Sequence, residues 1–470
     1  MYTVPKDISP NKVFIINRSE LEDRFDPEMI LYKKEVNHFN FETIELKKLL
    51  LRSPQYGANE SGIKRIKISE PRYIRITDIN EHGELIEELG ATAEKVEEKY
   101  VLNDNDILFA RSGATVGKAY LHKSKKVGYK AFFAGYMIRF VVDSNKILPE
   151  YLFAYTQLNV YKRWVKAIQR AAGQPNINAE EYKSLRIPLP TISKQKEIVE
   201  IIQSAYNLKQ QKEAKAKIFL ENINVYLLTE LGITPTLKDN SLVSRVFVKY
   251  LTDIEGRLDP LYYYSELTKF SNGYYNLLPL RQLVYSFKSG IGAGKSEQAI
   301  KGEGIIQIRP TNINDNGELI FEKNIYIPFE SVTDMLYKDD VLFNNTNSQE
   351  LVGKTTIYKG SMNLTYSNHI TVIRTRKDFL LPEYLWLILN LYQKHKIFYS
   401  ICTNWNNQSG IGIELLKSLQ IPIPPIEKQK EICNYIQNIR SKIKILQQEA
   451  KDILDNAKQQ VEQMILGNVS

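Results

Sequence analysis

The C-terminal segment 426–470 carries a regular apolar pattern that predicts one long helix. Its apolar residues recur almost throughout in alternating steps of four and three, which is the seam of a coiled coil. These positions are Ile432, Ile436, Ile439, Ile443, Leu446, Ala450, Ile453, Ala457 and Met464. We therefore expect this helix to bury one face along most of its length.

An earlier segment, 191–235, predicts a second long helix. Thr191 and Ser193 are candidate N-caps, and neither proline nor glycine follows before Glu230. Its seam positions are Ile198, Ile201, Ala205 and Leu208, followed after an interruption at Lys212 and Lys215 by Phe219, Ile223 and Leu227. Two such helices in one chain most simply pack on each other as an antiparallel coiled coil. The alternative, in which each helix docks only on its own globular part, stays open.

The segments before the two helices, about 13–190 and 246–424, have a mixed pattern. Short β-rich stretches such as Tyr73–Ile79 and Tyr136–Val142 alternate with Gly, Asn and Asp turns. A helix is expected after each Leu-Pro-Glu-Tyr-Leu, where Pro149 and Pro382 stand near the first helical position. Each segment ends in a strand punctuated by proline, Ile-Pro-Leu-Pro or Ile-Pro-Ile-Pro-Pro. The expected fold class is therefore α+β.

The chain contains the same unit twice, at an offset of 234 residues. Residues 74–85 and 308–319 are identical at 8 of 12 positions, and residues 187–198 and 421–432 at 9 of 12. Shorter matches keep the same order: 24–27 with 257–260, 106–109 with 340–343, 117–118 with 353–354, and 148–152 with 381–385. An internal pseudo-two-fold repeat follows, with globular domains 1–190 and 236–425 and helices 191–235 and 426–470.

Between the matching segments the two copies diverge, which indicates one task performed on two different targets. Neutral drift in surface loops would explain the same divergence. The net charge of +9 and the pI near 9.0 favour a polyanionic partner, although biased codon usage would also produce this charge. The 29 tyrosines suit wet, polar interfaces.

The cysteine count and the hydropathy pattern indicate a cytoplasmic protein. Cys402 and Cys433 are too few for a disulfide framework. The N-terminus lacks the pattern of a signal peptide, and no apolar run reaches 18 residues, so no membrane partner is expected.

Catalytic and metal-binding motifs are not apparent in the sequence. The stretch around Lys295 resembles a phosphate-binding loop, but Ser289 stands where that motif needs its first glycine. The five histidines are scattered and form no metal-ligand pair with a cysteine. There is no Gly-x-Ser-x-Gly elbow and no Asn-Pro-Pro-Tyr or Asp-Pro-Pro-Tyr motif of an amino-methyltransferase. We therefore expect no catalytic residues, no metal site and no cofactor in this chain.

Polar loops repeated in both copies are the candidate DNA contacts. Arg pairs with guanine and Asn or Gln with adenine through two hydrogen bonds, and Lys serves phosphates. In the first copy the candidates are Arg111, Ser112, Lys118, Lys123, Lys125, Arg170, Gln174 and Asn176. In the second copy they are Asn345, Asn347, Lys354, Asn404, Trp405, Asn407 and Gln408. Alternatively, the glycines only form turns and the Asn side chains cap their own backbone.

A globular unit ending in Ile-Pro-Leu-Pro, then Lys-Gln-Lys-Glu-Ile opening a long helix, all duplicated, resembles the specificity subunit of Type I restriction-modification systems. The stretch 105–108 followed by the Gly-rich loop 110–118 is similar to a target-recognition domain of that family. The resemblance covers essentially the whole chain. It implies a non-catalytic subunit with two target-recognition domains, each reading one half of an interrupted site on double-stranded DNA.

The resemblance also implies the partners and their cofactors. Two modification subunits would bind the helices and carry S-adenosylmethionine and the adenine methylation chemistry. Restriction subunits, which use ATP and magnesium, would join them for cleavage. A helix of about 38 residues, roughly 57 Å long, would span on the order of 16 base pairs and set the unread spacer. Because Asn345 replaces Arg111 in the second loop, a role of Arg111 does not transfer to that copy.

Two other function classes remain open at the level of sequence. One is a freestanding nuclease or methyltransferase with unfamiliar motifs, and the other is a protein-interaction scaffold that uses only the coiled coil.

Overall fold

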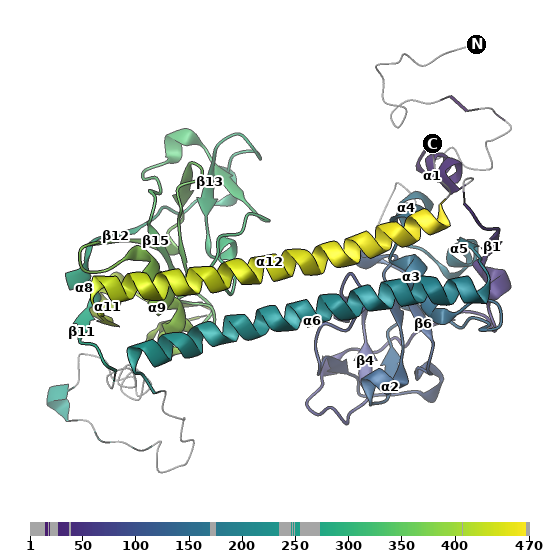
Figure 1. Cartoon of the computed structure of the whole chain (residues 1–470), viewed down its shortest axis with the longest axis horizontal. Helices are drawn as coiled ribbons and strands as arrows, with labels where there is room; N and C mark the ends of the chain where they lie inside the picture. Colours follow the sequence, from purple (N-terminus) through teal and green to yellow (C-terminus); the bar gives the residue numbers. More distant parts are fainter. Residues whose placement is uncertain are drawn as a thin grey trace. The chain divides into compact units, whose positions relative to one another are not determined.

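The computed structural model describes residues 15–16, 18, 27–36, 39–169, 175–234, 246, 248, 250–253, 273–406 and 408–466. The chain forms two compact units. The first unit consists of Met1–Glu213 and Gln447–Ser470, and the second of Ala214–Leu446. Each unit therefore combines one mixed α/β part with a section of both long helices (Figure 1). The sequence had predicted each long helix as a separate segment beside the globular domains, whereas the structure divides both helices between the two units.

The two long helices are α6, Ile192–Leu231, and α12, Ile426–Ile465. In the first unit, residues near the start of α6 share a core with residues near the end of α12: Ile198, Ile202, Ala205, Leu454, Ala457, Val461 and Ile465. In the second unit, residues near the end of α6 share a core with residues near the start of α12: Ala216, Ile223, Leu227, Ile432, Ile436 and Ile443. The start of one helix meets the end of the other in both units, which confirms antiparallel packing.

The seam of α6 differs from the prediction in its middle. Leu208 is 48% exposed, so its assignment to the seam was wrong. A step of four from the buried Ala205 leads instead to Lys209, whose side chain is 13% exposed and pairs with Glu213 at 2.8 Å. Lys212 follows and pairs with Glu449 of α12 at 2.6 Å. The seam therefore continues through Lys209 and Lys212. The aliphatic part of a lysine side chain can cover apolar surface while its ammonium group pairs with a carboxylate.

The mixed part of the first unit is built on two four-stranded sheets and one strand pair. One sheet has the order β2 (Gln55–Tyr56), β9 (Met137–Phe140), β6 (Ile107–Ala110), β7 (Ala119–Leu121). The other has the order β3 (Ile63–Lys64), β5 (Ala91–Thr92), β4 (Arg72–Ile74), β8 (Ala131–Phe133). The pair is β1 (Thr43–Glu45) with β10 (Arg186–Pro188). The helices are α1 (Pro27–Val36), α2 (Ser124–Val127), α3 (Pro149–Thr156), α4 (Asn159–Ile168) and α5 (Ala179–Lys183).

The second unit repeats this scheme. One sheet has the order β12 (Val284–Ser289), β19 (Ile370–Thr375), β15 (Val341–Asn344), β17 (Thr355–Ile357). Another has the order β14 (Ile325–Ile327), β13 (Ile305–Ile308), β18 (Leu364–Tyr366), and β11 (Leu277–Pro279) pairs with β22 (Gln420–Pro422). A small third sheet has the order β16 (Thr346–Asn347), β21 (Gln408–Gly410), β20 (Thr403–Trp405). The helices are α8 (Leu280–Leu283), α9 (Pro382–Lys394), α10 (Ile397–Ile401) and α11 (Ile413–Ser418).

The repeat predicted from sequence is confirmed at the level of strand pairing. The parallel pair of β4 and β8 has its counterpart in β13 and β18, and both Leu-Pro-Glu-Tyr-Leu segments open a helix with proline in its first turn. The predicted β stretch 73–79 is shorter than expected, because a 3-10 helix, Ile76–Asp78, replaces its second half. The Asp78 carboxylate accepts the backbone N–H of Arg75 at 3.0 Å and so stabilises this turn.

Candidate nucleic-acid interface

The two polar loops predicted for the first copy meet in the structure. Gly113 donates its backbone N–H to Pro175 O at 3.0 Å, and Ile177 donates to Arg111 O at 2.8 Å. Ser112 and Asn176 form an isolated antiparallel bridge between the loops. The predicted residues Arg111, Ser112 and Asn176 therefore belong to one surface, although they come from distant parts of the sequence.

This surface lines a hollow of about 590 Å³ in the first unit. The same hollow is lined by residues that sequence reasoning missed: Tyr56, Asn59, Glu60, Arg75 and Tyr136. Tyr56 is 40% exposed and Tyr136 is 63% exposed, so both present aromatic surface in the hollow. The only sequence signal for them was the high tyrosine content, which does not say which tyrosines face outward. We call this set of residues the unit-1 hollow.

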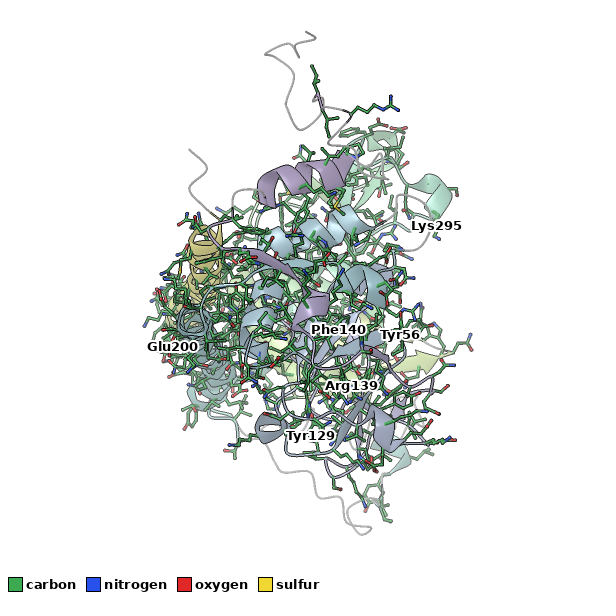
Figure 2. The ribbon with its side chains drawn as sticks, turned by 90° about the vertical axis from the view of Figure 1, so that its right-hand side faces the viewer. Tyr56, Tyr129, Arg139, Phe140, Glu200 and Lys295 are labelled. Carbon is green, nitrogen blue, oxygen red and sulfur yellow. The ribbon has the colours of Figure 1, made fainter. Side chains whose placement is uncertain are left out.

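Arg111 is held in the unit-1 hollow by an aromatic contact. Its guanidinium carbon lies 4.9 Å from the centre of the Tyr56 ring, a cation–π distance. Tyr56 is itself anchored, because its hydroxyl accepts the backbone N–H of Ala179 at 3.2 Å. In Figure 2, Tyr56 of β2 lies near Arg139 and Phe140 of the neighbouring strand β9, and Glu200 of α6 lies at the other side of the unit.

The floor of the unit-1 hollow depends on close backbone approach. A Cβ on Gly57 would lie 2.3 Å from Ala134 O, so no larger residue fits there without a shift. Gly135 donates its backbone N–H to Ala58 O at 2.7 Å, and Ala58 donates to Phe133 O at 2.8 Å. These bonds join the residues after β2 to the turn after β8, and Gly57, Ala58, Ala134 and Gly135 all line the hollow.

Three of the four predicted lysines, Lys118, Lys354 and Lys123, make contacts inside their own units. Lys118 donates to Ile79 O at 3.4 Å, and Lys354, in the matching place, forms an ion pair with Asp315. Lys118 and Lys354 each connect the Gly-rich loop to a neighbouring turn. The acceptor is a backbone carbonyl in the first unit and a carboxylate in the second. Lys123 forms an ion pair with Glu150 and lines a separate hollow of about 610 Å³ beside α6. Lys125 is exposed on α2 and does not line the unit-1 hollow.

Several predicted residues of the second copy meet in the small sheet β16–β21–β20. Asn347 pairs with Ser409, Asn404 also pairs with Ser409, and Trp405 pairs with Gln408 in the hairpin of β20 and β21. Asn404, Trp405 and Gln408 are exposed, Trp405 to 47%. The surface formed by these three side chains is called the unit-2 hairpin below. Arg170, Gln174 and Asn407 were also predicted and lie outside the described residues.

The unit-2 hairpin is held in a defined shape by its own contacts. Ser409 donates its hydroxyl to Asn404 Oδ1 at 2.6 Å. The Trp405 ring covers Gly410 so closely that a Cβ there would lie 2.4 Å from the ring. Asn347 is half-buried, and its side-chain oxygen accepts the backbone N–H of Ser348 at 2.8 Å.

Asn345, also a predicted DNA contact, takes an inward position in the structure. It is 8% exposed, and its amide nitrogen donates to Asn368 O at 3.1 Å and to Thr371 Oγ1 at 2.8 Å. Both amide hydrogens are therefore used inside the unit. Asn345 directly follows the buried strand β15, and its short side chain reaches these two acceptors inside the unit. The longer side chain of Arg111, at the matching position, lines the unit-1 hollow instead.

The ionisable groups near Arg111 and near Asn345 differ. Asp78 hydrogen bonds raise the pKa of the Arg75 guanidinium in the unit-1 hollow. In the second unit, burial lowers the pKa of Arg309, which donates to Gln307 Oε1 at 3.0 Å and to Ala293 O at 2.8 Å. Burial, with a contribution from the Arg309 charge, lowers the pKa of His369, so this ring is biased toward its neutral form. In the described part of the chain, no three His, Cys, Asp or Glu side chains gather as a metal site.

Comparison with known proteins gives the family. The model of the Type I restriction modification DNA specificity domain matches residues 66–218 and 293–454, which together make up more than half of the chain. The chain belongs to this family. The two matched segments fall on the two copies of the repeat, and each extends into one of the long helices.

Two specificity subunits of Methanocaldococcus jannaschii are similar in sequence. The type I restriction enzyme MjaVIII specificity subunit is 22% identical over 385 residues, covering 78% of this chain and 79% of the relative. The type I MjaX specificity subunit is 34% identical over 123 residues, covering 24% of this chain and only 29% of that relative. Their names describe both relatives as specificity subunits of type I restriction enzymes.

A solved structure concerned with complex assembly and conformational transition of the type I restriction-modification system has the same fold. It matches with a TM-score of 0.52 and 13% sequence identity, over 91% of this chain and 98% of the other. In the part of this chain that the structure describes, every helix is too short or too polar to span a membrane.

Proposed function

We propose that the chain is the subunit that selects the DNA sequence in a type I restriction-modification complex, with each unit reading one half of an interrupted duplex site. The observation that carries this proposal is that one scaffold, present twice, exposes two different polar and aromatic surfaces. The first is the unit-1 hollow around Arg111, and the second is the unit-2 hairpin with Asn404, Trp405 and Gln408. Arg, Asn and Gln are the side chains that pair with base edges through two hydrogen bonds.

The proposal includes two modification subunits as partners. Each copy of the repeat includes one long helix, and in the second unit the two helices present aromatic side chains beside charged ones. Tyr226 of α6 stacks on Tyr435 of α12 with ring centres 4.1 Å apart, and Tyr435 remains exposed. Lys428 and Glu230 form an ion pair at 2.6 Å next to them. Such mixed surfaces are typical of protein interfaces.

In this proposal the chemistry resides on the partners. Adenine methylation with S-adenosylmethionine belongs to the modification subunits, and DNA cleavage with ATP and magnesium to restriction subunits. This chain supplies recognition alone, in the cytoplasm. Neither the unit-1 hollow nor the unit-2 hairpin contains paired carboxylates or a nucleophile with an adjacent base, which acyl or phosphoryl chemistry would need.

The decisive experiment is selection from a randomised duplex library by the purified full chain, alone and with a modification subunit. We expect two fixed blocks of bases separated by an unread spacer, and affinity that falls steeply as salt rises. Binding without sequence preference would contradict the proposal and favour a protein-interaction scaffold. DNA cleavage or methylation by the chain alone would favour a freestanding enzyme. A complex that saturates with one modification subunit would contradict the two-partner arrangement.

A further inference from the structure

Arg111 combines unused guanidinium donors with a place on the surface of the unit-1 hollow. Arg72 also has guanidinium nitrogens without a partner, but it is only 1% exposed and lines a different hollow. Arg75 pairs with Asp78 at 2.7 Å, Arg139 pairs with Asp106 at 3.1 Å, and Arg65 donates to a row of backbone carbonyls. Among the described residues, the Arg111 guanidinium has no hydrogen-bond or carboxylate partner, and its Nε is buried without an acceptor. A guanidinium has five N–H donors in a rigid fork, so most of this binding capacity is free.

The Arg111 side chain is nevertheless positioned. The Tyr56 ring lies under its guanidinium, and the backbone of Ala179 holds the Tyr56 hydroxyl. Stacking of this kind fixes the plane of the fork and reduces the rotamer freedom that binding would otherwise remove. The backbone of Arg111 is fixed on both sides as well, since Arg111 donates its N–H to Tyr136 O at 2.9 Å and accepts from Ile177 N at 2.8 Å.

We propose that Arg111 reads a guanine in the half-site bound by the first unit, with Tyr56 as the residue that positions it. This inference rests on the proposed function and goes beyond it by naming the base and the atoms. Guanine presents O6 and N7 side by side in the major groove, and a planar guanidinium fork matches both acceptors. Tyr136, exposed at the rim beside Arg111, offers a flat apolar surface to the neighbouring base.

The surroundings of Arg111 favour a base over a phosphate. Arg75, the second arginine that lines this hollow, is paired with Asp78 at 2.7 Å, and Glu60 adds a negative charge that would repel a phosphate there. Asn59, Ser112 and Asn176 also line the hollow and add neutral donors and acceptors of the kind that read base edges. A phosphate site would instead be expected to gather several cations around one point.

The second unit reads its half-site by other means. Asn345 occupies the same backbone position as Arg111, because it donates its N–H to His369 O at 3.0 Å and accepts from Ile411 N at 2.9 Å. Its amide hydrogens are both used internally, so it offers no fork to a guanine. A guanine contact from this backbone position is therefore expected in the first half-site alone.

The test compares four variants with the wild-type chain by selection from a randomised duplex library. Arg111→Lys keeps the charge and removes the fork. Tyr56→Leu removes the ring, and Tyr56→Phe keeps it. Arg186→Lys is the matched control, because Arg186 is exposed on β10 and does not line the hollow. Thermal unfolding and an unchanged second half-site show that each variant is folded.

We expect Arg111→Lys to lose preference for one guanine by about 5- to 150-fold, the range for one bidentate base contact. Tyr56→Leu should weaken the preference at that same base pair, whereas Tyr56→Phe and Arg186→Lys should keep it. An equal loss of affinity for all sequences, with a shallower salt dependence, would identify a phosphate contact and overturn the inference. An unchanged preference in Arg111→Lys would also overturn it while leaving the proposed function intact. Failure of the wild-type chain to select any sequence would instead refute the proposed function itself.

Discussion

Gln195 accepts the backbone N–H of Leu148 at 2.8 Å, and so joins the start of α6 to the residue that precedes α3. The same side chain donates to Pro190 O at 2.9 Å, and it is fully buried. Gln429 makes the matching bonds with Leu381 and Pro424 in the second unit, each at 2.9 Å. The repeated Lys-Gln-Lys-Glu and Leu-Pro-Glu-Tyr-Leu motifs therefore form one buried junction between the long helix and the globular part.

Replacing Gln195 with alanine should destabilise the first unit. The substitution leaves the Leu148 N–H and the Pro190 carbonyl without partners in a buried place, at a cost of about 1–3 kcal/mol for each unsatisfied group. Gln203→Ala is the matched control, because Gln203 is exposed on the same helix and bonds only to Asn207. Denaturant unfolding measures both variants. Equal stability of the two would show that the junction contributes nothing.

Gly410→Ala should impair reading of the second half-site alone. Its new Cβ would collide with the Trp405 ring and displace an exposed side chain of the unit-2 hairpin. Gly412→Ala is the control, because a Cβ at that position meets nothing within 4 Å. Library selection should show a weakened second block of bases, by about 5-fold or more at one position, with the first block unchanged. Loss of both blocks would contradict independent reading.

Lys458 of α12 should make the stability of the first unit depend on pH. Burial, with the nearby charges of Lys162 and Lys209, lowers the pKa of its ammonium group to about 8. An unfolded lysine titrates near about 10.4, so between these values the unfolded state binds more protons and stability rises with pH. The cost of holding the charge is present in full below pH 8 and disappears above the unfolded pKa.

Lys458→Met removes this cost and should stabilise the unit at pH 7 by about 1 kcal/mol after allowance for solvent screening. The gain should shrink as pH rises toward about 10.4. Lys451→Met, at an exposed position of the same helix, controls for loss of a surface charge. Thermal unfolding of the three proteins between pH 7 and pH 10.5 tests the prediction, and a difference that stays constant over this range would refute it.

An insertion in α6 between Glu213 and Ala214 tests whether helix length sets the unread spacer. Four residues add about one turn, roughly 6 Å, which equals about two base pairs of 3.4 Å. We expect unchanged half-sites and a spacer longer by about one or two base pairs. The smaller value applies if the helices absorb part of the added length where Lys212 and Glu449 pair. A two-residue insertion is the control, since it turns the apolar face away from the seam and should reduce binding. Efficient binding with the original spacer after the four-residue insertion would refute the idea.

The sequence by itself determined the repeat, both long helices and the helices that open at Pro149 and Pro382, because apolar periodicity and proline position act locally along the chain. It also indicated the family, because the motifs that carry the resemblance are short uninterrupted stretches of sequence present in both copies. The prediction of Leu208 as a seam residue was wrong. In the sequence, lysines within an apolar repeat indicate an interruption of the seam, whereas in the structure Lys209 and Lys212 continue it.

Only the tertiary structure decided which of the candidate polar side chains are exposed and which are used inside their own unit. The sequence named both Arg111 and Asn345 as candidates without a transferable role, and the structure separates them: Arg111 stacks on Tyr56 in a hollow, while Asn345 donates both amide hydrogens into its own unit. Sequence reasoning did not find Tyr56 or Tyr136, because their exposure depends on the bonds between β2, β8 and the turns around them. The direction of a side chain at a strand end is set by contacts with residues far away in sequence, and no local pattern records them.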